Sequence, residues 1–485
     1  MALVDIASQK QLFVDGYLIE SMSHCALSMN RAEKVVDNPV LRPEHPWEGG
    51  DVSVSDVRWD EEAGRFEMRY STTRWQARRG KGEVIVEGEG QGHTCLAVSA
   101  DGLDWEKPVV GEVEYQGSKE NNILPLEWLM GYTYPDPNAT DPARRFRGHI
   151  RKGDTQTPGM TFDLYFSPDL KQWTPYADNP IIDTSPQIGR WGPTEFMGWD
   201  PIRDVYAVYM ENCHHRRTSL GKRLIGRSES LDGITWTEPE TILLPDAQDT
   251  PDTELYHMPC IAYEGLYVGL VWIFRTTNTT HHPELVFSRD AIHYQRNYRQ
   301  PFIERGGGID FDSVCLYANA PIVRGDRILT FYTGRNWRSP ETLLELGDRA
   351  TGAVGLAITR LDGFVSVDGI KGLAGNAPIG RPHFPEYSEL VTRSFSFSGS
   401  QLHLNIEAAR QQWGAGPCEL RVEILAPNHA YIPGYEFGDA DPITEGGLDC
   451  VASWKGCSDL SQMAGRTVKL RFYFKNAKLY SFQFS

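Results

Sequence analysis

The chain has 485 residues, of which 40% are hydrophobic and 23% charged, so its composition is globular and excludes extensive disorder. Its 65 acidic and 48 basic residues leave a formal net charge of −17, which argues against a nucleic-acid partner because phosphate-backbone binding needs a basic surface. The sequence shows neither a run of roughly 20 apolar residues that would span a membrane nor a signal-peptide pattern at its start. We expect no membrane partner and a cytoplasmic location.

The eight cysteines form no CxxC pair, and no histidine pair has zinc-finger spacing. We therefore expect reduced thiols, no metal ion and no cofactor. Dinucleotide-binding, P-loop and serine-hydrolase motifs are also missing from the sequence.

A short motif recurs along the chain at intervals of about 65 residues. It consists of Ser, any residue, Asp and an aromatic residue four positions after the Asp, and it occurs at 98–105, 166–173, 229–236 and 287–294. A weaker fifth copy occupies 358–365, where Thr359 replaces the serine. Asp in such a motif caps backbone amides in a tight turn between strands, and we expect the aromatic residue to pack between neighbouring sheets.

Strand-like runs precede these turns at 65–71, 205–211, 266–274 and 327–334. A unit of about four strands with one such turn has the size of a propeller blade with long loops. We therefore predict an all-β fold in which residues 1–380 form a five-bladed β-propeller. The only helical pattern is a short one at 341–350.

A Gly- and Pro-rich stretch after residue 375 reads as a linker. Alternating strands follow, so residues 381–485 are predicted to form a C-terminal antiparallel β-sandwich. The segments at 420–425, 432–443 and 458–484 resemble the terminal β-sandwich of glycoside hydrolase family 32 and its propeller relatives. The segments at 13–20 and 38–50 and the five repeats are similar to those relatives as well.

This resemblance implies a glycosidase that acts on an oligosaccharide or small glycoside of the fructo- or arabinofuranoside type, with a homo-oligomer contact through the sandwich. The chain lacks the Trp-Met-Asn-Asp-Pro-Asn-Gly, Arg-Asp-Pro and Glu-Cys motifs of the fructosidases, which argues against invertase-type chemistry on sucrose. The repeats also look like the Asp-box of sialidases, but the count indicates five blades rather than six.

Glycoside hydrolysis needs two carboxyl groups on either side of the scissile bond. The resemblance implies that they lie where the first strand of each blade begins, at the funnel of the propeller. The candidates there are Asp51, as nucleophile or base, with Asp56 as its competitor, Glu254 as general acid, and Glu195 as stabiliser or alternative acid.

Substrate-binding candidates lie on the same stretches. His257 and the stacking candidates Trp47, Trp199 and Tyr256 stand near the predicted strand starts. Asp310 and Asp312 alternate with apolar residues after three glycines, which predicts that both face one side of a strand. Asp56 belongs to this set if Asp51 is the catalytic residue.

Two other functions stay open at this point. One is a non-catalytic carbohydrate-binding propeller, and the other is a phosphorylase, which needs basic residues at the funnel such as Arg58, Arg216 and Arg217. The polar insertion at 74–93 is either a lid over the funnel or an oligomer contact. Adjacent His214 and His215 point to opposite faces of a strand, so no metal site is expected there.

Overall fold

The computed structural model describes residues 4–80, 84–89, 92–125, 133–153, 160–184, 190–212, 222–369, 387–408 and 417–485. These residues fold almost entirely as β-strands, in agreement with the predicted class. They divide into two compact units: one holds 32–322 and 329–358, and the other holds the remaining N-terminal and C-terminal residues with 323–328. Each unit has a hydrophobic core of its own.

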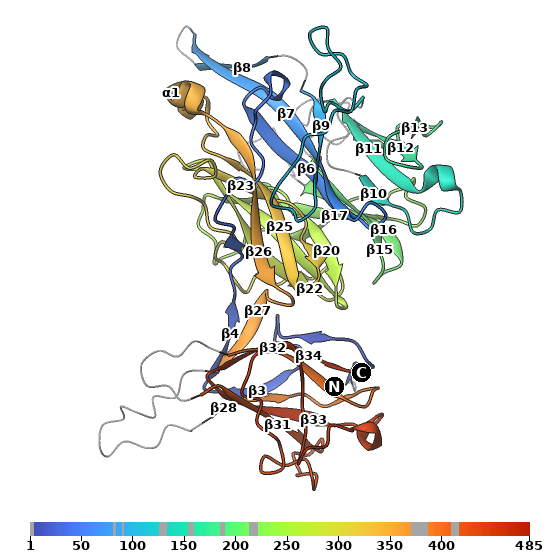
Figure 1. The fold of residues 1–485 in the computed structure, drawn as a ribbon, viewed down its shortest axis with the longest axis vertical. Coiled ribbons are helices and arrows are strands. Elements are labelled where there is room, and N and C mark those ends of the chain that lie inside the picture. Colours follow the sequence, from blue (N-terminus) through green and yellow to red (C-terminus); the bar gives the residue numbers. More distant parts are fainter. Residues whose placement is uncertain are drawn as a thin grey trace. The chain divides into compact units, whose positions relative to one another are not determined.

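The larger unit is a five-bladed β-propeller of antiparallel sheets (Figure 1). Its first two blades are built from successive strands of the chain, with the short 3-10 helices η1 (Pro46–Glu48) and η2 (Pro142–Arg144) in their connections. The first contains β6 (Asp51–Asp60), β7 (Arg65–Arg79) and β9 (Thr94–Ser99), with β8 (Val84–Glu89) paired to the far end of β7. The second contains β10 (Thr133–Pro135), β11 (Phe146–Lys152), β12 (Thr161–Ser167), β13 (Thr174–Pro175) and β14 (Ile182–Asp183).

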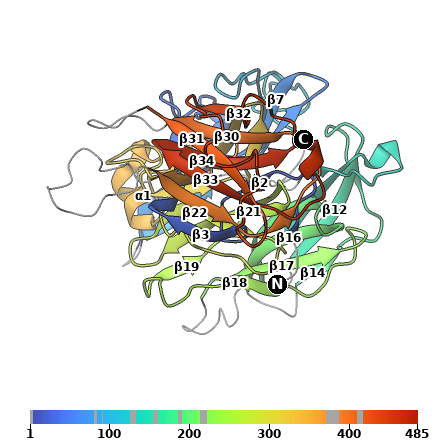
Figure 2. The same ribbon diagram turned by 90° about the horizontal axis from the view of Figure 1, so that it is seen from below.

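The third blade is β15 (Arg190–Asp200), β16 (Val205–Asn212), β17 (Ile225–Ser230) and β18 (Glu240–Leu243), and three of these strands are labelled side by side in Figure 2. The fourth is β19 (Thr253–Leu255) and β20 (Cys260–Tyr263), which together pair with β21 (Leu266–Arg275), and then β22 (Thr280–Ser288).

The last blade contains β23 (Cys315–Ala318), β25 (Arg327–Arg335) and β26 (Gly352–Arg360). The short strand β24 (Ile322–Arg324) pairs with β25, and residues 323–328 of this hairpin are grouped with the other unit. The outer strand of the blade is β5 (Glu33–Lys34), which comes from the beginning of the unit and pairs with β26. This pairing closes the ring between early and late parts of the chain. The predicted helical segment is α1 (Pro340–Leu346), followed by η3 (Gly347–Arg349).

The repeated motif forms the predicted turn after the third strand of each of the first four blades. In the first blade the Asp101 carboxylate accepts hydrogen bonds from the backbone amides of Leu103 and Asp104 at 2.8 and 3.1 Å, and Ser99 Oγ accepts one from Gly102. Asp169, Asp232 and Asp290 make the equivalent bonds in their own blades. The Trp105 ring that closes the first turn lies 5.7 Å from Phe331 of the last blade, so the aromatic residue packs between blades as predicted.

The second unit is a β-sandwich (Figures 1 and 2). One sheet contains β32 (Gly447–Val451), β30 (Leu402–Ala408), β34 (Ala477–Phe484), β27 (Val365–Gly369) and β4 (Cys25–Met29), with β2 (Gln11–Leu12) paired to β34. The other contains β3 (Ile19–Ser23), β28 (Ser388–Thr392), β33 (Lys469–Lys475) and β31 (Glu419–Leu425), while β1 (Val4–Asp5) pairs with β29 (Phe395–Ser396) and η4 (Ser461–Met463) precedes β33.

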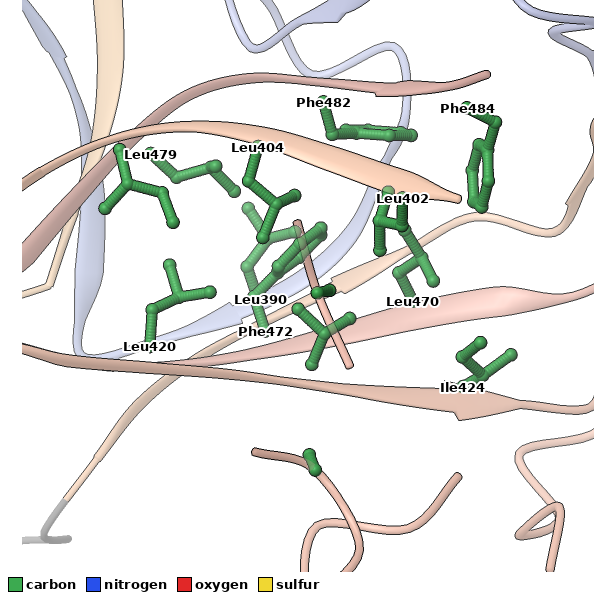
Figure 3. Packing of buried hydrophobic residues seen from close by; sticks show 14 of the residues in the cluster. Leu390, Leu402, Leu404, Leu420, Ile424, Leu470, Phe472, Leu479, Phe482 and Phe484 are labelled. Carbon is green, nitrogen blue, oxygen red and sulfur yellow. The ribbon is translucent and has the colours of Figure 1, made fainter. Parts of the chain in front are cut away.

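Alternating residues of these strands point into one apolar core. Leu404 and Phe482 come from one sheet, and Leu420, Leu470 and Phe472 come from the other (Figure 3). All five are at most 1% exposed. The alternation of apolar residues along each strand therefore produces the sandwich that the sequence predicts.

The N-terminal segment was expected to belong to the propeller, and this expectation is wrong. Strands β1 to β4 pair with strands of the sandwich, and residues up to Arg31 belong to that unit. The physical reason is that the sandwich sheets have open edges, which these strands complete. The predicted boundary at residue 380 lies outside the described residues.

Candidate active site

A cavity lies among the inner strands of the propeller, at the centre of the unit. It encloses about 350 Å³ and is lined by residues of all five blades. Its lining includes Asp56, Thr133, Glu195, Cys260 and Asn319, one from each blade in chain order. Inner strands that converge in this way bring residues from distant parts of the sequence into one channel.

Asp51 begins the inner strand of the first blade and is 4% exposed. Arg335, at the end of β25, donates to both carboxylate oxygens: Nη2 to Oδ1 at 2.8 Å and Nε to Oδ2 at 2.9 Å. Burial opposes the charge on Arg335, but the nearby Asp51 raises the pKa of the guanidinium above its usual value. A Cβ on Gly352 would lie 2.5 Å from the Asp51 carboxylate, so glycine at 352 makes room for it. Asp51 and Arg335 therefore form a fixed ion pair in which the carboxylate is buried.

Glu254 lies in β19, at the beginning of the inner strand of the fourth blade. Arg223 forms ion pairs with both Glu254 and the buried Glu211, the latter through Nε at 3.1 Å. The ion pair with Arg223 holds the Glu254 side chain in place.

Glu195 lies on β15 and faces the central cavity with its side chain 21% exposed. Its Oε2 is 3.4 Å from Nε2 of His257, whose ring is buried. Among the described residues, Nδ1 of His257 has no hydrogen-bond partner. A carboxyl group that is open to the cavity and adjoins an imidazole is arranged for proton transfer.

Aromatic rings connect these three carboxylates and their arginine or histidine partners. Tyr256 lies over the Arg223 guanidinium at 5.2 Å and contacts His281 at 4.9 Å between ring centroids. His281 contacts Tyr317 at 4.9 Å, and Tyr317 lies 4.9 Å from Trp272. The Trp272 ring meets His257 at 4.5 Å, and the Arg335 guanidinium lies 6.0 Å from the Tyr317 ring.

We call this arrangement the channel site: Asp51, Glu195 and Glu254, their partners Arg335, His257 and Arg223, and the aromatic rings between them. Continuous contacts thus join all three predicted catalytic carboxylates through one aromatic wall. Partly exposed rings next to charged groups can bind a sugar, because the apolar face of the sugar stacks and its hydroxyl groups accept and donate hydrogen bonds.

Three arginines of this region were missed from the sequence: Arg223, Arg335 and Arg338. Burial and then the charges of these residues hold the pKa of His281 well below its ordinary value. One signal could have found Arg335. In an antiparallel hairpin the end of the second strand lies beside the start of the first. A charged residue that ends the second strand of a blade therefore lies next to the residues that begin its inner strand.

The predicted binding role of Asp310 and Asp312 is not supported by their positions. Both lie in a loop before β23 rather than on a strand, so the predicted alternation is wrong. Asp310 is exposed, and its carboxylate accepts a hydrogen bond from the Gly307 amide at 3.0 Å. Asp312 is 2% exposed and holds Lys34 of β5 at 2.5 Å and Tyr332 at 2.9 Å. Asp312 therefore stabilises the position of β5, the strand that closes the ring of blades.

The remaining candidates divide between the cavity and the packing of the blades. Trp199 lines the cavity, and so does Asp56, which pairs with Arg69 at 2.9 Å. Trp47 instead donates to Asn122 at 2.8 Å and stacks on a neighbouring imidazole. Arg58 forms an ion pair with Glu67 of the same blade, away from the cavity lining. The other predicted groups, Arg216, Arg217, His214 and His215, lie outside the described residues.

Within the described ranges, no group of three or more His, Cys, Asp or Glu side chains is arranged to hold a metal ion. The seven cysteines in this part of the chain are free thiols. No helix among the described residues is long and apolar enough to cross a membrane.

No known family model matches the chain, and no curated protein matches its sequence. Several solved structures are similar to it at low identity. One titled "Glycoside hydrolase" is 14% identical with a TM-score of 0.46, covering 76% of this chain and 95% of the other. A beta-1,2-mannobiose phosphorylase from Listeria innocua is 11% identical with a TM-score of 0.45, covering 69% and 99%.

A third structure is titled "The GH130 family of mannoside phosphorylases contains glycoside hydrolases that target beta-1,2 mannosidic linkages in Candida mannan". It is 14% identical with a TM-score of 0.42, covering 68% of this chain and 94% of the other. At these values none of the three structures indicates what this chain does. The resemblance to family 32 stays a prediction.

Proposed function

We propose that this protein is a glycan-active enzyme that cleaves the glycosidic bond of a small glycan in the channel site. The observation that carries this proposal is the arrangement of Asp51, Glu195 and Glu254 around one aromatic wall, each beside a cationic or imidazole side chain. Glycoside cleavage requires one carboxyl group that gives a proton and one that stays ionised.

In the proposed hydrolysis, the bond between the anomeric carbon and the bridging oxygen breaks. Glu195 gives its proton to the leaving oxygen, and water adds to the anomeric carbon and loses a proton to an ionised carboxylate. Asp51 and Glu254 are the two candidates for the second role, and an arginine holds each of them in place. His257, beside Glu195, positions the acid and can return its proton.

The test is a turnover screen of the purified protein on aryl furanosides, aryl pyranosides and a panel of small oligosaccharides. Glu195→Gln is expected to lower turnover by about a hundredfold or more, the usual contribution of a general acid. Asp310→Asn is the matched control, because this carboxylate is exposed in a loop and should leave turnover unchanged. The furanosides in the panel test the predicted sugar class.

Full turnover by Glu195→Gln would contradict the assignment of the acid. Binding of sugars without turnover by the wild type would favour the carbohydrate-binding alternative. Circular dichroism of each variant shows whether the fold persists, so a loss of activity is not confused with unfolding.

Phosphorolysis is a second candidate, and Arg338 is the observation that favours it. Its guanidinium lies 6.0 Å from the rings of both Tyr256 and Phe274, and it makes no ion pair with an acidic residue in the described part of the chain. In phosphorolysis a phosphate oxygen replaces water at the anomeric carbon, and the products are a sugar 1-phosphate and a free sugar. Turnover that requires added phosphate, with a raised KM for phosphate in Arg338→Met, would establish this reaction.

A further inference from the structure

A second cavity opens on the propeller at the first and last blades. It encloses about 540 Å³, within the range of roughly 300–1,000 Å³ that small-molecule sites occupy. Its lining comes from the segment before β6, from β7, and from α1 and the residues that follow it. The residues that matter here are His45, Gly50, Arg74, Trp75 and Asp348.

Trp75 lines this cavity, and this large aromatic residue is 37% exposed. Tryptophan prefers at least partial burial, so an exposed indole in a hollow marks a surface that can be covered by a ligand. His45, Arg74 and Asp348 supply hydrogen-bonding groups around it. An apolar platform with polar groups at its edge matches the faces of a sugar ring, which is apolar above and hydroxylated at its rim.

The cavity is joined to the channel site by direct contacts. The Trp75 ring meets the Trp337 ring at 6.0 Å with an interplanar angle of 62°. The Arg335 guanidinium lies 5.5 Å from the Trp337 ring, and Arg335 binds Asp51. Gly50, on the cavity wall, directly precedes Asp51 in the chain. The second cavity therefore lies beside the Asp51–Arg335 pair of the channel site.

We propose that this cavity is a binding subsite for a further sugar unit, with Trp75 as its stacking platform, so that the substrate is an oligosaccharide rather than a monosaccharide glycoside. This inference rests on the proposed function, because it assigns the substrate class of the channel site. It also gives part of the polar insertion at 74–93 a role as a wall of a subsite, in place of the expected lid or oligomer contact.

The test compares Trp75→Ala, Trp75→Phe and wild type on an aryl glycoside and on oligosaccharides of increasing length that carry the same sugar. Removal of a ground-state contact raises KM and leaves kcat nearly unchanged. We expect Trp75→Ala to raise KM for the oligosaccharides by about tenfold, equivalent to about 1.4 kcal/mol. KM for the aryl glycoside should stay within about twofold, and Trp75→Phe should restore much of the affinity. Tyr431→Ala, which removes an exposed aromatic ring of the sandwich unit, is the matched control.

An unchanged oligosaccharide KM in Trp75→Ala would overturn the inference, and so would an equal rise for both substrates, which would place the effect at the reaction centre. Calorimetric titration of oligosaccharides separates this inference from the proposed function. If no substrate is turned over but oligosaccharides bind to wild type and about tenfold more weakly to Trp75→Ala, the subsite stands and the proposed reaction fails. If no oligosaccharide binds, the subsite is refuted.

Discussion

Acidification is expected to destabilise the propeller through two buried histidines, His149 and His281. Neither ring is exposed to solvent. Burial first, and nearby arginine charges second, hold the pKa of each ring well below its ordinary value of about 6.5. The folded protein keeps both rings neutral, whereas the unfolded chain takes up a proton at each as the pH falls through about 6.5. The stability linked to these groups is therefore complete above that pH and is lost below it.

The magnitude follows from the protonation of the unfolded chain. One pKa unit corresponds to about 1.4 kcal/mol, so a histidine that titrates only when unfolded lowers the free energy of unfolding by about 1.4 kcal/mol between pH 7.5 and 5.5. The two rings together lower it by about 2.8 kcal/mol. His149 lies flat on Phe196 at 3.7 Å between centroids, and its Nε2 is 3.0 Å from the Tyr134 hydroxyl, so an aromatic replacement can keep the stack.

The assay is urea unfolding followed by tryptophan fluorescence at pH 7.5, 6.5 and 5.5 for wild type and His149→Phe. The pH-dependent loss of unfolding free energy should be smaller by about 1.4 kcal/mol in His149→Phe, whatever the stability of this variant at pH 7.5. His24→Gln, which changes an exposed histidine of the other unit, should leave the loss unchanged. Equal losses in wild type and His149→Phe would refute the reasoning.

Two further predictions concern the closure of the ring and the approach to Asp51. Asp312→Asn should lower the free energy of unfolding by about 2 kcal/mol, because Lys34 and Tyr332 lose a charged hydrogen-bond partner. A change below about 0.5 kcal/mol in urea unfolding would contradict this. Gly49→Ala should cost about 1–3 kcal/mol, because φ is +65° and the new Cβ would lie 2.8 Å from the Arg74 amide nitrogen. Gly50→Ala, with φ +93° but no atom within 4 Å, should melt at a higher temperature than Gly49→Ala; the reverse order would count against the steric argument.

The sequence alone predicted those features that depend on neighbours in the chain. The turn at Ser99 and Asp101 forms from hydrogen bonds between residues two or three positions apart, so four copies of one motif were enough to predict the repeated blade. The alternation of apolar residues likewise predicted the sandwich. The resemblance to propeller glycosidases directed the search to acids near the starts of inner strands, and Asp51, Glu195 and Glu254 do adjoin a common aromatic wall, although Glu195 lies in the middle of β15.

The tertiary structure decided everything that depends on which distant segments meet. Asp51 is fixed by Arg335, 284 residues further along the chain, and Asp312 is bound to Lys34, 278 residues before it. No local pattern marks such a partner, because closing a ring of blades brings together residues whose separation in the chain carries no periodic signal. Asp312, predicted as a sugar ligand, instead binds Lys34 in the strand that closes the ring. The tertiary structure also pairs Glu254 with Arg223 and places the Trp75 indole in a cavity beside the channel site.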